Sequence, residues 1–198
     1  RFPSHVAIRS ILKKTAFPLA MPSANISSNV SPVSAEDVAD EFKNSLKFIL
    51  DGGKSKVGIE STVIDLIGKP TILRPGIIEV DLIAKALNTK INLPKKNSKI
   101  ISPGMLRRHY SPGIPIILNQ EPINGAIACI TLGKKYKNKK NYFNLSKRSN
   151  LKEAASNLYK TLRIIKKLKF KKINIVKIPN HGVGIAINDR LQRAAKKK

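Results

Sequence analysis

The stretch from Asn150 to Ile178, NLKEAASNLYKTLRIIKKLKFKKINIVKI, decides the fold because it holds one long helix followed by one strand. Asn150 can cap the first helical turn together with Glu153. Apolar side chains then recur at helical spacing on one face, at Leu151, Ala154, Ala155, Leu158, Leu162 and Ile165. The apolar run from Ile173 to Ile178 predicts a strand.

The segments on either side of this stretch extend the same pattern. Two short apolar runs before it, Ile114 to Leu118 and Ala126 to Leu132, are of strand type and are separated by a turn that contains Pro and Gly. Gly184 to Ala195 predicts a last helix after it. Because strands that alternate with helices favour a parallel sheet, we predict a small parallel α/β domain over residues 114–198.

Residues 1–88 also alternate between helix and strand signals, and residues 89–113 have the Lys- and Pro-containing character of a linker. Ser34 can cap a helix together with Asp37, since a hydroxyl and a carboxylate three positions apart satisfy free backbone N–H groups. The predicted helices are Ser4 to Lys13, the segment after Ser34, and Ile78 to Leu87. The predicted strands are Phe48 to Leu50, Ser61 to Leu66, and Thr71 to Arg74.

The charge of the chain is extreme, since 38 Lys and Arg residues against 12 Asp and Glu residues give +26. This charge favours phosphate-bearing partners such as nucleotides or RNA, although a solvated Lys-rich surface explains it as well. Cys129 is the one cysteine, which excludes a disulfide framework and a cysteine metal site. No apolar run approaches the roughly 20 residues that span a bilayer, so we expect a soluble cytoplasmic protein without a membrane partner.

A loop rich in hydroxyl groups is the first candidate site. It runs from Pro22 to Pro32, contains Ser23, Asn25 and Ser31, and precedes the helix that Ser34 opens. Hydroxyl groups and backbone N–H groups ahead of a helix suit a phosphate. Polar loops ahead of helices are also common without a ligand.

Two further candidates lie at the predicted strands that follow. Glu60, Ser61 and Thr62 form a polar triplet at the mouth of an apolar strand, which is either a site or a strand cap. Arg74 ends the next strand before Pro75 and Gly76, where its side chain can meet a phosphate or a carboxylate, or simply be solvated.

The linker and the last helix supply two more candidates. Ser102 to Pro112 concentrates Arg, His and Tyr between prolines, so we expect it to dock on another part of the molecule. Tyr110 can stack on a base, and the arginines can meet phosphates. Gly182-Val183-Gly184 is a Gly-rich turn for which entry into a helix is a sufficient explanation.

Taken in order, these segments resemble the YrdC-like threonylcarbamoyl-AMP synthases in their long form, which has an additional C-terminal domain. The matching segments are Pro22 to Asn25 with Ser31-Pro32, Asp51 to Gly53, Gly58 to Val63, Leu73 to Gly76, Ser102 to Pro112, and Asn188 to Leu191. The resemblance implies a partial YrdC-like α/β catalytic domain over residues 1–88, a linker over 89–113, and a small Rossmann-like parallel α/β domain over 114–198.

The resemblance implies an enzyme of the nucleotidyltransferase type. Bicarbonate carboxylates the amine of L-threonine, the carbamate attacks the α-phosphate of ATP, and pyrophosphate leaves as threonylcarbamoyl-AMP forms. The tRNA threonylcarbamoyl-transfer machinery then modifies the adenosine beside the anticodon of tRNA. Mg²⁺ is expected to be carried in with ATP.

The resemblance also implies roles for individual residues, in a site that works by positioning and charge neutralisation and in which no residue is assigned as catalytic. The ATP-binding residues are Ser23, Asn25, Ser31 and Arg74, with His109 and Tyr110 bringing the linker over the nucleotide as a lid. The threonine-binding residues are Arg1, Met21 and Ser61.

The chain departs from the family pattern at its start. It begins at Arg1 rather than Met, and the Lys-x-Arg strand of the family does not precede this residue. We therefore expect the chain to be N-terminally incomplete, and inactive or nearly so by itself.

Two other interpretations compete with the enzyme. A basic RNA-binding module without catalysis would depend on scattered lysines and on salt concentration, rather than on Ser23 and Arg74. A related carbamoyl-transfer maturation protein would need zinc-finger regions, for which the chain has no cysteine pattern.

Overall fold

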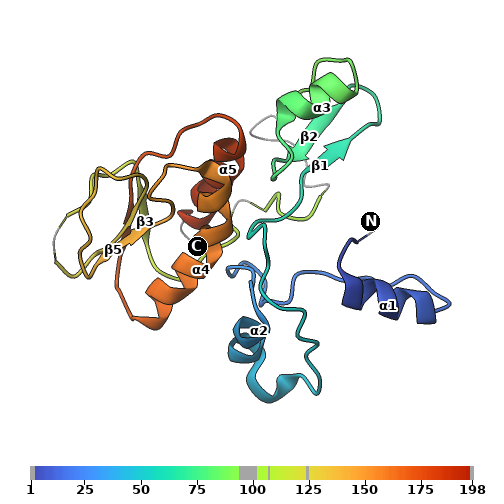
Figure 1. Cartoon of the computed structure of the whole chain (residues 1–198), viewed down its shortest axis with the longest axis horizontal. Helices are drawn as coiled ribbons and strands as arrows, with labels where there is room; N and C mark the ends of the chain where they lie inside the picture. Colours follow the sequence, from blue (N-terminus) through green and yellow to red (C-terminus); the bar gives the residue numbers. More distant parts are fainter. Residues whose placement is uncertain (1–2, 94–101, 107, 124, 197–198) are drawn as a thin grey trace.

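The computed structural model describes residues 3–93, 102–106, 108–123 and 125–196, and Figure 1 shows their arrangement. We call residues 3–88 the first part and residues 114–196 the second part. The elements of the first part are α1 (Val6–Lys14), α2 (Ala35–Phe42), the short 3₁₀ helix η1 (Lys43–Ser45), β1 (Val63–Asp65), β2 (Thr71–Arg74) and α3 (Val80–Ala86). The elements of the second part are β3 (Ile116–Leu118), β4 (Ala128–Thr131), β5 (Tyr142–Asn144), α4 (Leu151–Lys167), β6 (Ile173–Ile175) and α5 (Val183–Ala194).

The second part is built on a four-stranded sheet in the order β3-β6-β4-β5. Every neighbouring pair in it is parallel, with Ile173 of β6 opposite Ile116 of β3 on one side and opposite Ala128 of β4 on the other. In Figure 1, α4 and α5 lie side by side next to this sheet. The parallel α/β domain predicted from the sequence is therefore confirmed.

The core of the second part forms where the sheet meets these helices. Four strand residues, Ala128, Ile130, Ile173 and Ile175, have exposed fractions of 0%. The predicted apolar face of α4 packs into the same cluster, with Ala154, Ala155, Leu158, Leu162 and Ile165 all buried. At the start of α4, the side chain of Asn150 accepts hydrogen bonds from the backbone N–H groups of Lys152 and Glu153, as its capping role requires.

The first part has little core of its own. No residue of α1 is buried, and β1 and β2 form a two-stranded antiparallel sheet in which Val63 faces Arg74. Among the described residues 3–88, the buried apolar side chains are those of Val30, Ile59, Ile72 and Leu73. Large apolar side chains are instead exposed at Val6, Phe17, Met21, Phe48, Leu50, Leu66 and Ile67.

One predicted strand is absent from the structure, and one strand of the structure was not predicted. Phe48 to Leu50 belongs to no strand, because no described segment pairs with it, and Phe48 is 91% exposed. β5 was not predicted, since its three residues follow a Lys-rich run and show no apolar run of their own. Parallel pairing with β4 defines β5, and that pairing is not visible in a short local pattern.

The described residues of the linker pack against both parts. The backbone N–H of Ser111 donates to the carbonyl of Ser28 at 2.9 Å, which ties the linker to the hydroxyl-rich loop. Tyr110 is 1% exposed and belongs to the same apolar cluster as α4 and α5. The linker thus brings the loop before α2 close to the helices of the second part.

This distribution of buried area predicts where stability resides. Replacing Leu158, which is 0% exposed, by Ala should lower the free energy of unfolding by about 2–5 kcal/mol, because the change removes buried apolar contacts and leaves a cavity. The matched control is Leu168→Ala at the end of α4, where the side chain is 58% exposed and the loss should stay below about 1 kcal/mol. Chemical denaturation measures both, and equal losses would contradict this placement of the core.

Candidate functional site

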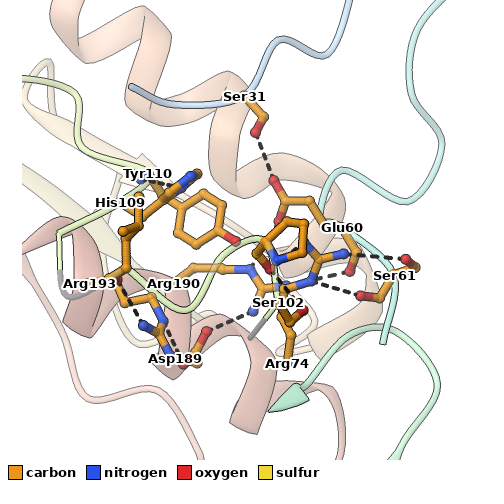
Figure 2. Close-up of polar contacts among 12 residues, drawn as sticks. Ser31, Glu60, Ser61, Arg74, Ser102, His109, Tyr110, Asp189, Arg190 and Arg193 are labelled. Carbon is orange, nitrogen blue, oxygen red and sulfur yellow. Dashed lines mark hydrogen bonds and ion pairs between the residues drawn. The ribbon is translucent and has the colours of Figure 1, made fainter. Parts of the chain in front are cut away.

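A half-buried carboxylate, Glu60, joins the two parts of the chain. It lies before β1, and Figure 2 shows it between Ser31 and Arg190. Its Oε1 accepts a hydrogen bond from Ser31 Oγ at 2.7 Å. Its Oε2 accepts one from the Tyr159 hydroxyl at 2.8 Å and one from Arg190 Nε at 3.0 Å. Because Tyr159 lies on α4 and Arg190 on α5, Glu60 connects the loop before α2 to both helices of the second part.

Arg190 is charged and has a side chain that is 1% exposed. Its Nη1 lies 2.8 Å from Asp189 Oδ2, and its Cζ lies 5.1 Å from the centroid of the Tyr110 ring. The Tyr110 ring stacks on the Tyr159 ring with 5.8 Å between centroids. Two carboxylates and an aromatic face thus replace the water that the guanidinium loses on burial, which would otherwise cost several kcal/mol.

A glycine permits this contact between the two parts. Any Cβ at Gly58 would lie 2.5 Å from the Cα of Ser156 on α4, and the φ of Gly58 is +77°. Both conditions require glycine. The Ser156 hydroxyl donates to the carbonyl of Lys56 at 2.9 Å and holds the same approach. The segment that carries Glu60 can therefore reach Tyr159.

The surroundings of Glu60 keep it ionised at neutral pH. Burial raises its pKa, but the Arg190 charge and the hydrogen bonds from Ser31 and Tyr159 outweigh burial and lower the pKa below the ordinary value of 4.5. Burial and the facing Glu60 carboxylate raise the pKa of Tyr159 well above its usual value. Glu60 is consequently an acceptor, and both hydroxyls that face it are donors.

Arg74 is the second buried arginine of the site, and its surroundings differ from those of Arg190. It is 4% exposed, and it donates from Nε to the Ser61 carbonyl at 3.1 Å, from Nη1 to the Pro103 carbonyl at 3.2 Å and from Nη2 to Ser61 Oγ at 3.4 Å. All three acceptors are neutral, and no carboxylate of the described residues forms an ion pair with Arg74. A guanidinium has five N–H donors, so two of them have no acceptor among the described residues.

The side chain of Tyr110, from the linker, ends near Arg74. Its φ of 60° is rare for a residue other than glycine, and its buried hydroxyl has no hydrogen-bond partner among the described residues. Any Cβ at Gly104 would overlap this hydroxyl and would lie 2.9 Å from Arg74 Cδ. Gly104 therefore allows the linker, the Tyr110 hydroxyl and Arg74 to occupy one small volume.

His109 adjoins this group and is half-buried. Its Nδ1 accepts a hydrogen bond from the backbone N–H of Tyr110 at 3.0 Å. Burial lowers its pKa, and the charges of Arg193, Arg190 and Arg74 lower it further against the opposing effect of Glu60. The imidazole is accordingly neutral at physiological pH, which fits its role as an acceptor at Nδ1.

The loop that carries Ser31 is also held by its backbone. Arg163 of α4 donates to the carbonyl of Val30 at 2.7 Å and to the carbonyl of Ser31 at 3.3 Å. The same side chain forms ion pairs with Asp37 at 3.8 Å and with Glu41 at 3.4 Å. α4 thus positions both the main chain and, through Tyr159 and Glu60, the hydroxyl of Ser31.

The structure brings together several residues that the sequence predicted for the site. Ser31, Ser61, Arg74, His109 and Tyr110 all surround Glu60 and Arg190 in Figure 2. Predicted ATP ligands and a predicted threonine ligand therefore share one region, with Ser61 in direct contact with Arg74. Their roles toward a ligand stay predictions.

The remaining predicted residues lie in another part of the hydroxyl-rich loop or just before it, or they fall outside the described residues. Met21 and Ser23 are exposed, and no hydrogen bond of the described residues joins their side chains to the group around Glu60. The Asn25 side chain donates to the carbonyl of Ile26 at 2.8 Å and so shapes its own loop. Arg1 lies outside the described residues.

Sequence reasoning assigned no role to the residues that organise this site. Glu60 was recognised only as part of a polar triplet, and Arg190 only within the segment Asn188 to Leu191. Tyr159 lies beside the apolar face of α4, and its polar hydroxyl at such a position is the signal that could have found it.

The described residues offer neither a metal-binding cluster nor a membrane-spanning helix. They contain no group of three or more His, Cys, Asp or Glu side chains that could hold a metal ion. No described helix is both long enough and apolar enough to cross a membrane.

Comparison with protein families divides the chain near Gly76. Residues 77–196 match the family model described as "Threonylcarbamoyl-AMP synthase, C-terminal domain". Residues 1–76 match a model described as "Telomere recombination", which covers the Sua5, YciO and YrdC proteins. These matches confirm the resemblance that the sequence motifs suggested.

Individual relatives extend this likeness over nearly the whole chain. Threonylcarbamoyl-AMP synthases of Pyrococcus abyssi and Bacillus subtilis are each 32% identical over 98% of this chain. The crystal structure of P. abyssi Sua5 complexed with L-threonine superposes with a TM-score of 0.85 at 29% identity, again over 98% of this chain. A His/Tyr double-alanine variant of that protein gives a TM-score of 0.81 at 27% identity. The chain spans 63% and 62% of the length of the two curated relatives.

The lowered pKa of Glu60 predicts a stability that depends on pH. A carboxyl group whose pKa is lower in the folded than in the unfolded chain stabilises the fold above the unfolded pKa, and this contribution is lost as pH falls through the folded pKa. Glu60→Gln should thus lower the free energy of unfolding by about 1.5–3 kcal/mol at pH 7, because Arg190 loses one of its two charged acceptors. The deficit should shrink as pH falls below 4.5.

Chemical denaturation at pH 7 and at pH 3 to 5 measures this deficit. The control is Glu121→Gln, which changes a side chain that is 72% exposed and should cost at most about 1 kcal/mol. A deficit of Glu60→Gln that stays constant across this pH range would contradict the ion pair.

Proposed function

The chain belongs to the threonylcarbamoyl-AMP synthase family, and from this premise we propose that it supplies one side of a site that makes threonylcarbamoyl-AMP from L-threonine, bicarbonate and ATP. The chain spans about three fifths of the curated relatives it matches, so the reaction, the substrates and the link to tRNA modification are proposed as properties of the whole enzyme. The part that this chain contributes is argued from its own residues.

The observation that carries the proposal is the buried Arg74. Its neighbours are neutral oxygens, and two of its N–H donors have no acceptor among the described residues. A buried guanidinium without a carboxylate is costly unless an anion neutralises it. The triphosphate of ATP is such an anion, and a planar guanidinium can meet two of its oxygens at once.

The residues beside Arg74 suit the second substrate. Ser61 is an exposed residue whose hydroxyl accepts a hydrogen bond from Arg74, and this hydroxyl can also hydrogen-bond to L-threonine. We place threonine there, with Met21 and Arg1 as the other predicted contacts, and the nucleotide at Ser31, Ser23 and Asn25 with the linker residues His109 and Tyr110. The positive side chain of Arg74 then lies between two reacting groups. One is the amine of threonine, which becomes the carbamate, and the other is the α-phosphate that the carbamate attacks.

The chemistry that this arrangement supports is an adenylation. The threonine nitrogen attacks the carbon of bicarbonate, one C–O bond breaks, and water leaves as the carbamate forms. A carbamate oxygen then attacks the α-phosphorus of ATP, and the bond to pyrophosphate breaks with its electron pair going to the pyrophosphate. Arg74 would stabilise the negative charge that builds up on the phosphate oxygens. Mg²⁺, carried in on the phosphates, would neutralise further charge.

RNA binding is a second candidate function, and one surface feature favours it. Five lysines of the loop between β4 and β5 are exposed, namely Lys134, Lys135, Lys137, Lys139 and Lys140. Such a cluster attracts a phosphate backbone, and with the net charge of +26 it supports tRNA as a partner. Replacing Lys134, Lys137 and Lys140 by Glu should weaken the binding of labelled tRNA most at low salt and leave ATP binding unchanged. Unaltered tRNA affinity would exclude this loop as the binding surface.

Arg74→Ala tests the nucleotide site. The loss of charge-assisted hydrogen bonds worth about 1.5–3 kcal/mol should raise the dissociation constant for ATP by about 10- to 100-fold, as measured by isothermal titration calorimetry. Binding is the better measurement here than turnover, since the chain spans about three fifths of its relatives.

The matched control is Arg148→Ala, because the Arg148 side chain is 80% exposed and lies outside the site. Circular dichroism should show the native fold in both variants. An ATP affinity that Arg74→Ala leaves unchanged would exclude Arg74 as the phosphate ligand.

A further inference from the structure

The hydroxyl of Ser31 has its hydrogen-bonding direction fixed by Glu60. A serine hydroxyl has one proton to donate and two lone pairs that can accept. Ser31 Oγ donates its proton to Glu60 Oε1 at 2.7 Å, and no donor of the described residues uses its lone pairs. Toward a ligand, Ser31 is therefore an acceptor.

The second part of the chain enforces this direction. Tyr159 and Arg190 both donate to Glu60 Oε2, which leaves Oε1 to Ser31. If Ser31 turned its proton toward a ligand, Oε1 of the half-buried Glu60 carboxylate would lose its donor, and that loss is costly. Arg163 holds the carbonyl of Ser31 at 3.3 Å and limits any shift of the backbone that could compensate.

We propose that Glu60, paired with Arg190, is a positioning residue that presents Ser31 as an acceptor to a donor group of the nucleoside of ATP, either a ribose hydroxyl or the adenine amino group. This inference rests on the proposed function and adds an orientation to it. Ionised phosphate oxygens only accept hydrogen bonds, so they do not pair with an oxygen whose proton is already used. The triphosphate then lies at Arg74, and the nucleoside lies at Ser31.

The first test compares ATP with inorganic tripolyphosphate, which lacks the nucleoside. Dissociation constants for both are measured by calorimetry at one Mg²⁺ concentration, for the unaltered chain and for Ser31→Ala. We expect Ser31→Ala to raise the dissociation constant for ATP by about 3- to 10-fold, as the loss of one neutral hydrogen bond predicts. The dissociation constant for tripolyphosphate should change by less than about twofold. Ser27→Ala, which removes an exposed hydroxyl of the same loop, should change neither.

The second test reverses the direction of the Ser31 hydrogen bond. In Glu60→Gln, the amide oxygen must face Arg190 and Tyr159, because both are donors, so the amide NH₂ faces Ser31. The NH₂ then occupies a lone pair of Ser31 and releases its proton for a ligand. ATP should bind several-fold more weakly, whereas tripolyphosphate should bind as tightly as before or more tightly. If the role of Glu60 were merely structural, Glu60→Gln would weaken the binding of both ligands together.

The outcomes separate this inference from the proposed function. If the unaltered chain binds neither ligand, the proposed function fails and the inference fails with it. If the chain binds both ligands and Ser31→Ala weakens both equally, or neither, the nucleotide site stands and the inference alone is overturned. If Glu60→Gln does not fold, the comparison of Ser31→Ala with Ser27→Ala still decides whether Ser31 contacts the nucleoside of ATP or the triphosphate.

Discussion

The ion pair between Glu60 and Arg190 is the interaction on which the arrangement of the site depends. Both groups have lost most of their water, so the pair is stable only because other groups complete its hydrogen bonds. Ser31 and Tyr159 complete those of Glu60, and Asp189 and the face of Tyr110 complete the surroundings of Arg190. Each of these groups comes from a different segment, so completing the surroundings of one ion pair assembles the loop before α2, the linker, α4 and α5.

The two buried arginines of the site show what this arrangement leaves open. Arg190 is neutralised within the chain, whereas Arg74 is held by neutral oxygens. The first is therefore a structural charge that fixes geometry, and the second is a charge that an anionic ligand can neutralise. Tyr110 has the Arg190 guanidinium over its ring and its hydroxyl near the Arg74 side chain. Its backbone conformation is rare, and its buried hydroxyl has no partner among the described residues. The linker is thus coupled to both arginines.

Local patterns in the sequence predicted much of the fold but little of this assembly. The helix α4 could be predicted because it buries one apolar face, and the strands β4 and β6 could be predicted because every one of their residues is buried in the same core. β3 contributes Ile116 to that core. The strand predicted at Phe48 to Leu50 is absent, because a strand needs a pairing partner and local apolarity does not reveal one.

For the site, the family motifs pointed to Ser31, Ser61, Arg74 and Tyr110, which the structure brings together. Arg190 was not identified because it meets Glu60 across 130 positions of sequence, and no spacing rule reaches that far. A double-mutant cycle of Glu60→Gln and Arg190→Met on ATP affinity, in variants shown by circular dichroism to be folded, tests the central claim most directly. If the pair positions the site as one unit, the double variant should bind ATP about as weakly as the weaker single variant, with a coupling energy of about 1–3 kcal/mol. Losses of ATP affinity that simply add in the double variant would contradict the claim that the pair positions the site as one unit.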